Sequence, residues 1–182
     1  MTHISERYRR RADQFESKLA AVTPDAWNRP SPCPDWDALG VVRHLVESSQ
    51  FFLSWVEMGE TGGPAVGNDP MGAWRALRAG VEQALNDPAV ADRVLERSMG
   101  TMPFAQFVDQ YLSFDLVVHA WDLAKAAGID DQLNPVDVRE VKTQAESMVE
   151  IGRKMGAFGP AVDATDGAEE QTQLLALLGR RR

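Results

Sequence analysis

The stretch SFDLVVHAWDLAKA (residues 113–126) decides how the rest of the sequence is interpreted. Its apolar residues recur as in a buried helix, yet it also carries Asp115, His119 and Asp122. Spacings of four and three residues place these three polar side chains on one side of a helix. The same side carries the apolar residues Val108 and Leu112, so we expect it to face the interior. Because buried polar groups are costly without partners, the three side chains must find a partner there.

Helical periodicity extends over most of the chain and predicts an all-α fold. Helices are predicted over residues 4–21, 37–58, 70–86, 103–127 and 135–155, with a short additional C-terminal helix in QTQLLALLG (171–179). Residues 87–102 leave two alternatives open, a short extended pair or an irregular crossover. The connections on either side of the third helix are too long for a simple up-down bundle, so we expect at least one crossover.

Composition and charge limit the classes of partner. The 182 residues are enough for one domain, spanning 1–182, with a substantial core. A net charge of -8 argues against nucleic acid and anionic membranes as partners. Cys33 is the sole cysteine, the first residues lack the apolar core of a signal peptide, and no apolar run approaches the ~18 residues of a membrane helix. We therefore expect a soluble cytoplasmic protein.

A second histidine, His44, lies on a different predicted helix and shares its stripe with Val41, Phe51 and Trp55. One interpretation is that His44 and His119 are unrelated core histidines, each satisfied by a carbonyl or hydroxyl group. The other interpretation is a metal site in the bundle core, with His44, Asp115 and His119 as ligands. Two imidazoles and one carboxylate suit zinc, nickel or ferrous iron and leave a coordination position open for catalysis. Residue spacing alone favours neither interpretation.

Three further polar residues have competing roles. Asp122 could replace Asp115 as a ligand, orient His119 through a hydrogen bond, or bind a neighbouring helix. Cys33 lies between two prolines before a helix N-terminus, where the helix dipole would favour a nucleophilic thiolate. However, no histidine is near it in sequence and isolated cysteines are usually small buried residues, so we expect a structural role. Glu47 lies beside the His44 face, and we expect it to be solvated.

Four segments carry a family resemblance: AWNRPSPCPDWDALGVVRHLV (26–46), DLVVHAWDLAKAAG (115–128), FGPAV (158–162) and LLALLGR (174–180). Together they resemble the DinB-like superfamily, and more narrowly its mycothiol-dependent maleylpyruvate isomerase branch among actinobacterial metal-binding proteins. The resemblance covers nearly the whole chain. It implies a four-helix bundle with a long crossover connection and one bound divalent metal, commonly zinc.

The resemblance also implies which residues bind this metal. The family's ligand on the second helix falls on His44, and its two ligands one turn apart on the later helix fall on Asp115 and His119. The isomerase branch has glutamate at the position of Asp115, so this chain offers a carboxylate that is one methylene shorter.

The implied function is that of a metal-dependent thiol transferase or isomerase. A small thiol of the mycothiol type would occupy the open metal position and attack a small electrophile. Asp122 is then the candidate catalytic residue, because it could orient His119 or handle a proton. The alternatives are a metal-dependent hydrolase and a non-catalytic metal-binding or dimerising stress protein. Members of the family often pair, so we also expect a homodimer.

Overall fold

The computed structural model describes residues 3–154, 156–165 and 167–182. The chain divides into two compact units, residues 1–130 and 131–182, and each is described here by itself. The single domain expected over residues 1–182 stays a prediction. Among the described residues, no helix has the length and hydropathy of a membrane-spanning segment.

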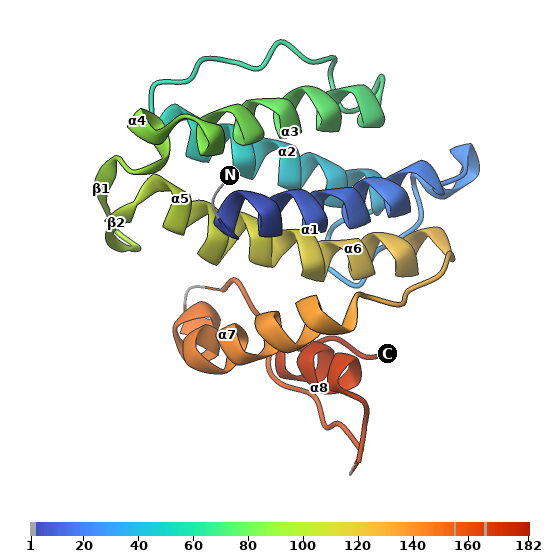
Figure 1. Cartoon of the computed structure of the whole chain (residues 1–182). Helices are drawn as coiled ribbons and strands as arrows, with labels where there is room; N and C mark the ends of the chain where they lie inside the picture. The colour runs from blue at the N-terminus through green and yellow to red at the C-terminus, as the bar shows by residue number, and fades with distance from the viewer. Residues whose placement is uncertain (1–2, 155, 166) are drawn as a thin grey trace. The chain divides into compact units, whose positions relative to one another are not determined.

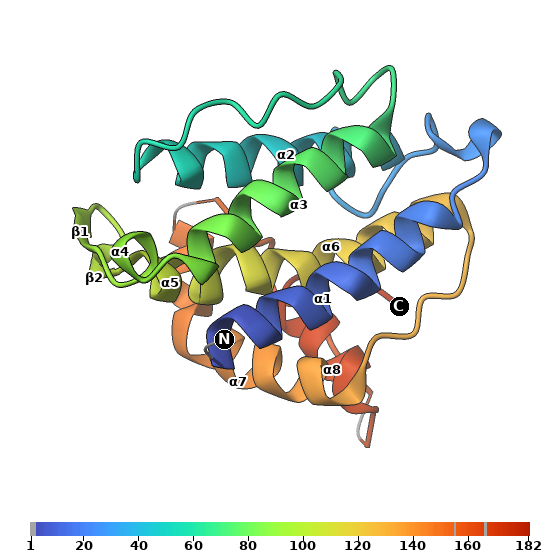
Figure 2. The same ribbon diagram turned by 45° about the horizontal axis from the view of Figure 1, so that its top comes forward.

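Four long helices build the first unit: α1 (His3–Ala20), α2 (Ala38–Ser54), α3 (Pro70–Asn86) and α6 (Ser113–Ala127). Helix α1 packs against α3 and α6, and α2 packs against the same two helices, so the four close around a shared core. Figures 1 and 2 show α2 and α3 running in the same direction, because residues 55–69 cross back along the length of the bundle. The predicted all-α DinB-like bundle with a long crossover is confirmed.

The starts of these helices follow local sequence signals. The Asp37 carboxylate accepts a hydrogen bond from the Gly40 N–H at 2.7 Å and caps α2. The Asp69 carboxylate caps α3 in the same way, and Pro70 occupies the first helical position, where its missing N–H costs nothing. A short 3-10 turn, η1 (Pro24–Ala26), precedes the loop that leads into α2.

Helix ends were predicted less well. Gly128 ends α6 as predicted, with the positive φ of 70° that glycine adopts without strain. Helix α2, by contrast, ends at Ser54 and not at residue 58. Glu57 adopts a left-handed φ of 63°, and the Met58 N–H donates to the Leu53 carbonyl, which closes the helix early.

The segment between α3 and α6 contains short elements: α4 (Pro88–Ala91), β1 (Val94–Arg97), β2 (Gly100–Pro103) and α5 (Phe104–Phe107). Strands β1 and β2 pair antiparallel, so the extended alternative for this region is confirmed. The helix predicted over 103–127 is interrupted by a π turn, η2 (Val108–Leu112). Such turns are rare and often occur beside functional sites. Here the π turn directly precedes the helix that carries Asp115 and His119.

Aromatic and aliphatic side chains fill the core of the bundle. Phe15 of α1 meets Trp74 of α3 edge to face, with ring centroids 4.8 Å apart, and both side chains are fully buried. Leu45 of α2 and Leu123 of α6 are buried with them. This packing holds fixed the helices that carry the polar residues of the site.

The second unit consists of α7 (Pro135–Lys154) and α8 (Glu170–Leu177), which pack against each other. The last residue of the predicted helix 135–155 lies outside the described residues. The side chain of Gln171 joins the start of the unit to α8: it accepts from the Leu133 N–H at 3.0 Å and donates to the Asp131 carbonyl at 2.9 Å.

Candidate metal centre

Helices α2 and α6 bring His44 and Asp115 together. His44 Nε2 lies 3.3 Å from Asp115 Oδ2, although 71 residues separate them in sequence. The other ring nitrogen, Nδ1, lies 3.4 Å from Ser48 Oγ one turn along α2. Both side chains are partly accessible, with about 30% of each exposed. This pair therefore lies at the edge of the core and can be reached from solvent.

His119 lies beside this pair but is much more deeply buried, with 6% of its surface exposed. Its ring meets the His44 ring nearly edge to face, with centroids 4.9 Å apart and planes at 70°. His119 Nδ1 lies 2.9 Å from Asp122 Oδ2, and Asp122 is fully buried. A buried carboxylate on one ring nitrogen fixes the orientation of the imidazole and leaves the other nitrogen as an acceptor.

The three predicted ligands thus converge. Ligand atoms from His44, Asp115 and His119 all lie within 4.8 Å of one another. Ligand atoms that share one cation at bonds of about 2.0–2.2 Å lie about 3.4 Å apart in a tetrahedral site, so small side-chain shifts suffice to bring all three onto one ion. The described residues therefore contain a cluster suited to a divalent cation, while the roles of its three residues as ligands stay a prediction.

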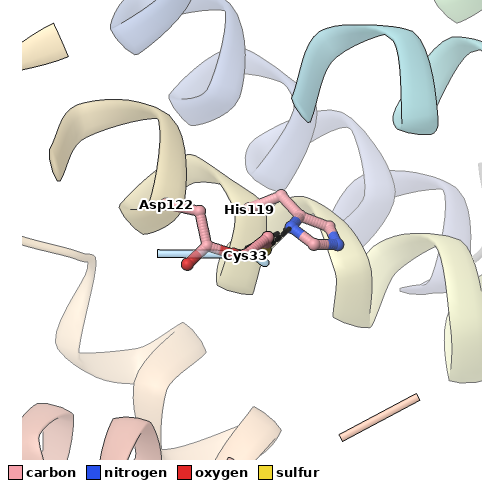
Figure 3. A group of neighbouring side chains, drawn as sticks. All are labelled: Cys33, His119 and Asp122. Atoms are coloured by element: carbon pink, nitrogen blue, oxygen red, sulfur yellow. Dashed lines mark hydrogen bonds and ion pairs between the residues drawn. The ribbon is translucent and has the colours of Figure 1, made fainter. Parts of the chain in front are cut away.

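Cys33 differs most from the expectation. Its side chain is only half-buried, and Sγ donates a hydrogen bond to Asp122 Oδ2 at 3.2 Å. Sγ also lies 4.0 Å from His119 Nδ1 (Figure 3). Cys33, His119 and Asp122 thereby form a second cluster of metal-ligating groups. The expected role of Cys33 as a buried structural residue does not describe these contacts.

A tight turn in the loop before α2 places the thiol. The Ser31 N–H donates to the Trp36 carbonyl at 2.9 Å, and the Trp36 N–H donates to the Cys33 carbonyl at 3.2 Å. The Cys33 N–H also donates to Ser31 Oγ at 3.1 Å. Asp35 adopts a left-handed φ of 66°, which is uncommon for a residue other than glycine. Backbone hydrogen bonds and this turn hold Cys33 against α6.

The same loop and the first turns of α2 surround an open pocket of about 560 Å³. Cys33, Trp36, Arg43, His44 and Glu47 are among its lining residues. The volume lies within the range of small-molecule sites. Glu47 is exposed, as expected, but it borders the pocket that His44 faces.

Trp36 was not among the predicted site residues. Its ring lies 4.6 Å from that of His44 and 5.7 Å from that of His119, measured between centroids. The signal in the sequence was its place just before the helix that carries His44. Ser48, one turn after His44, carried a similar signal. In both cases the direction of the side chain depends on the folded loop and helix.

Comparisons with known proteins cover the part of the chain that carries both clusters. The family model of the mycothiol maleylpyruvate isomerase N-terminal domain matches residues 8–124, which include both clusters. Two Mycobacterium tuberculosis proteins, uncharacterized protein MT0763 of strain CDC 1551 / Oshkosh and uncharacterized protein Rv0738 of strain ATCC 25618 / H37Rv, are each 27% identical over 177 residues, 95% of either chain. No solved structure matches significantly. Because the family model covers well over half of the sequence, the chain belongs to the family of the mycothiol maleylpyruvate isomerase N-terminal domain, as its resemblance predicted.

Proposed function

We propose that the protein binds one divalent cation, zinc in the first place, through His44, Asp115 and His119. We further propose that it uses this cation to join a small thiol of the mycothiol type to a small electrophile, or to isomerise that electrophile through the thiol. One observation carries the proposal: two imidazoles and a carboxylate from α2 and α6 converge beside an open pocket. Membership of a mycothiol-related family supports the choice of thiol.

The residues fit such a cation. In a tetrahedral zinc site, bonds of about 2.0–2.2 Å put nitrogen and oxygen ligands roughly 3.4 Å apart. His44 Nε2 and Asp115 Oδ2 are 3.3 Å apart. Although aspartate is one methylene shorter than glutamate, the Asp115 carboxylate therefore lies close enough to His44 to share a cation with it. Three protein ligands leave one position open, which is the arrangement of catalytic zinc sites.

Each of the two imidazoles has a polar oxygen next to its Nδ1 atom. Ser48 Oγ lies at Nδ1 of His44, and Asp122 Oδ2 lies at Nδ1 of His119. When Nδ1 carries the proton in each ring, Nε2 presents its lone pair to the cation. We therefore assign Asp122 a positioning role through His119. Direct proton transfer by Asp122 stays a prediction.

The pocket would receive the reactants. When bound, the cation would stabilise the thiolate of the small thiol and so supply a nucleophile at neutral pH. His44 and Trp36 border the pocket and would fix the end of the thiol that carries sulfur. The remaining volume of the pocket would hold the electrophile near that sulfur.

Metal content tests the first half of the proposal. Protein purified without added metal should contain about one equivalent of divalent metal, measured by elemental analysis, in line with three shared ligands. The Cys33→Ser, His44→Ala double variant, in which the second cluster cannot hold the cation either, should lose this metal, whereas Cys33→Ser alone should keep it. Circular dichroism should show that the helices of both variants are intact. Equal metal content in the two variants would overturn the assignment.

Turnover tests the second half. The metal-loaded protein is incubated with mycothiol and an epoxide or chlorinated electrophile, and consumption of both reactants is followed. Thiol-dependent consumption that is lost in His44→Ala supports the proposal. Thiol-independent consumption would replace it with a metal-dependent hydrolase. Absence of turnover over a broad panel of electrophiles would replace it with a non-catalytic metal-binding role.

A further inference from the structure

His119 has a second set of neighbours, which the proposed function uses only for orientation. Asp122 Oδ2 lies 2.9 Å from His119 Nδ1 and 3.2 Å from Cys33 Sγ. Cys33 Sγ lies 4.0 Å from His119 Nδ1. Figure 3 shows the second ring nitrogen of His119 on the far side of the ring from Cys33 and Asp122. The three ligand atoms therefore lie together on the Nδ1 side of the ring, while Nε2 lies on the opposite side.

This arrangement is unsuited to a nucleophile relay. In a relay of thiol, imidazole and carboxylate, the nucleophile and the carboxylate bind opposite nitrogens of the histidine ring. Here both approach Nδ1. A single nitrogen cannot both donate its proton to Asp122 and accept the proton of Cys33. The cluster thus does not activate Cys33 as a nucleophile through His119.

The distances fit a cation better. With bonds of about 2.3 Å to sulfur and 2.0–2.2 Å to nitrogen and oxygen, a tetrahedral zinc site separates its ligands by roughly 3.4–3.6 Å. Each observed separation is within about half an ångström of this range. Asp122 is fully buried and His119 nearly so, whereas Cys33 borders the pocket and gives access from solvent.

We propose that Cys33, Asp122 and Nδ1 of His119 form a second metal site, for a thiophilic divalent cation of the zinc, cadmium and cobalt class. A thiolate ligand selects such cations over harder ones. Binding releases the thiol proton of Cys33 to solvent and moves the His119 proton from Nδ1 to Nε2. Since Nε2 is then protonated, the second site competes with the first, and the protein binds one cation at a time.

Cobalt(II) alone is the probe for this site. A cobalt–thiolate bond gives a near-ultraviolet charge-transfer band, and because Cys33 is the sole cysteine, that band reports this site alone. Metal-free wild-type protein titrated with cobalt should show the band. Cys33→Ser should lose the band and still bind one equivalent through the first site. His44→Ala should retain the band, more intense per cobalt because the competing site is gone.

These variants separate the two proposals. Loss of the band in His44→Ala, with intact circular dichroism, would overturn the second site. If His44→Ala retains the band while Cys33→Ser binds no cobalt, the first site is overturned and the second one stands. The wild-type protein provides a test without any variant. Cadmium should protect Cys33 from alkylation by iodoacetamide, which the mass of the intact chain measures. Unchanged alkylation of Cys33 in the presence of cadmium would also overturn the proposal.

Discussion

Two clusters of polar side chains bridge helices of the first unit, and they are satisfied in different ways. Between α1 and α3, the Arg78 guanidinium donates to Glu82 at 2.8 Å, to Glu16 at 3.0 Å and also to Asp13. Between α2 and α6, His44 faces Asp115. The arginine cluster combines fixed donors with acceptors, whereas each ring nitrogen of the histidine cluster can either donate or accept.

In the arginine cluster, each carboxylate named above accepts a hydrogen bond from a permanently charged arginine. Although burial opposes the shift, hydrogen bonds from Arg75 and Arg78 hold the pKa of Glu16 below its usual value. Burial alone would lower the pKa of Arg78. Hydrogen bonds to Glu82 and Asp13 outweigh burial, so this pKa is raised. In the histidine cluster, the imidazole nitrogens and the carboxylate can instead present lone pairs to a cation. This difference distinguishes a structural ion-pair network from a candidate metal centre.

The largest effect is expected from His119→Ala, which removes a ligand of both candidate sites. Stoichiometric metal binding should be lost, and so should the stabilisation of about 2.7 kcal/mol that free zinc at 100 times its Kd would give the wild type. Elemental analysis and thermal denaturation with and without zinc measure the two quantities. Arg78→Met is the matched control and should bind metal as the wild type does. If His119→Ala contained as much metal as the wild type, the histidine cluster would not be the metal centre that distinguishes it from the arginine cluster.

A smaller effect should separate the two carboxylates of α6. At the first site, Asp122→Asn keeps the cation but loosens the orientation of His119, so zinc affinity there should fall about 10–100-fold. Asp115→Asn removes a charged ligand of the first site and should reduce affinity further. Competition with a chromogenic chelator, in a Cys33→Ser background that lacks the second site, measures both. Equal losses would mean that Asp122 binds the cation of the first site as directly as Asp115 does.

The contrast between the clusters also shows what the sequence could predict. Helix spacing was enough to place Asp115, His119 and Asp122 along one side of α6, because that relation is local. Asp37, Asp69 and Gly128 marked helix boundaries for the same reason. The convergence of His44 on α6 needed the resemblance as well, since spacing within each helix says nothing of which helices are neighbours.

Contacts that depend on irregular backbone could not be predicted. Cys33 reaches Asp122 across 89 residues, and the hydrogen-bonded loop with its turn at Asp35 directs it there. The π turn before α6 has no sequence marker, because Val108–Leu112 suits an α-helix equally well. The arginine network likewise joins side chains more than 50 residues apart in sequence.

Removing the centre of the arginine network should affect stability and leave metal binding unchanged. Arg78→Met leaves Asp13, Glu16 and Glu82 without their shared donor, and Arg78 is largely shielded, with 17% of its side chain exposed. We expect a loss of about 1–3 kcal/mol in the free energy of unfolding, between the values typical of exposed and of buried ion pairs. Urea denaturation of the metal-free proteins measures it. A loss that appears only in the presence of zinc would contradict the separation of the two clusters.

The smallest effect concerns acid stability. Because the pKa of Glu16 is lower in the folded than in the unfolded protein, its ion pairs stabilise the fold above the unfolded pKa of roughly 4.3. That stabilisation is lost as the pH falls through the lower folded pKa. Glu16→Gln should therefore weaken the fold at pH 7 by less than about 1 kcal/mol and flatten its stability between about pH 5 and 3. Urea denaturation at several pH values measures this slope. Arg78→Met should flatten the same region, since it removes a hydrogen-bond donor that lowers this pKa, and a slope unchanged in both variants would contradict the role of the network.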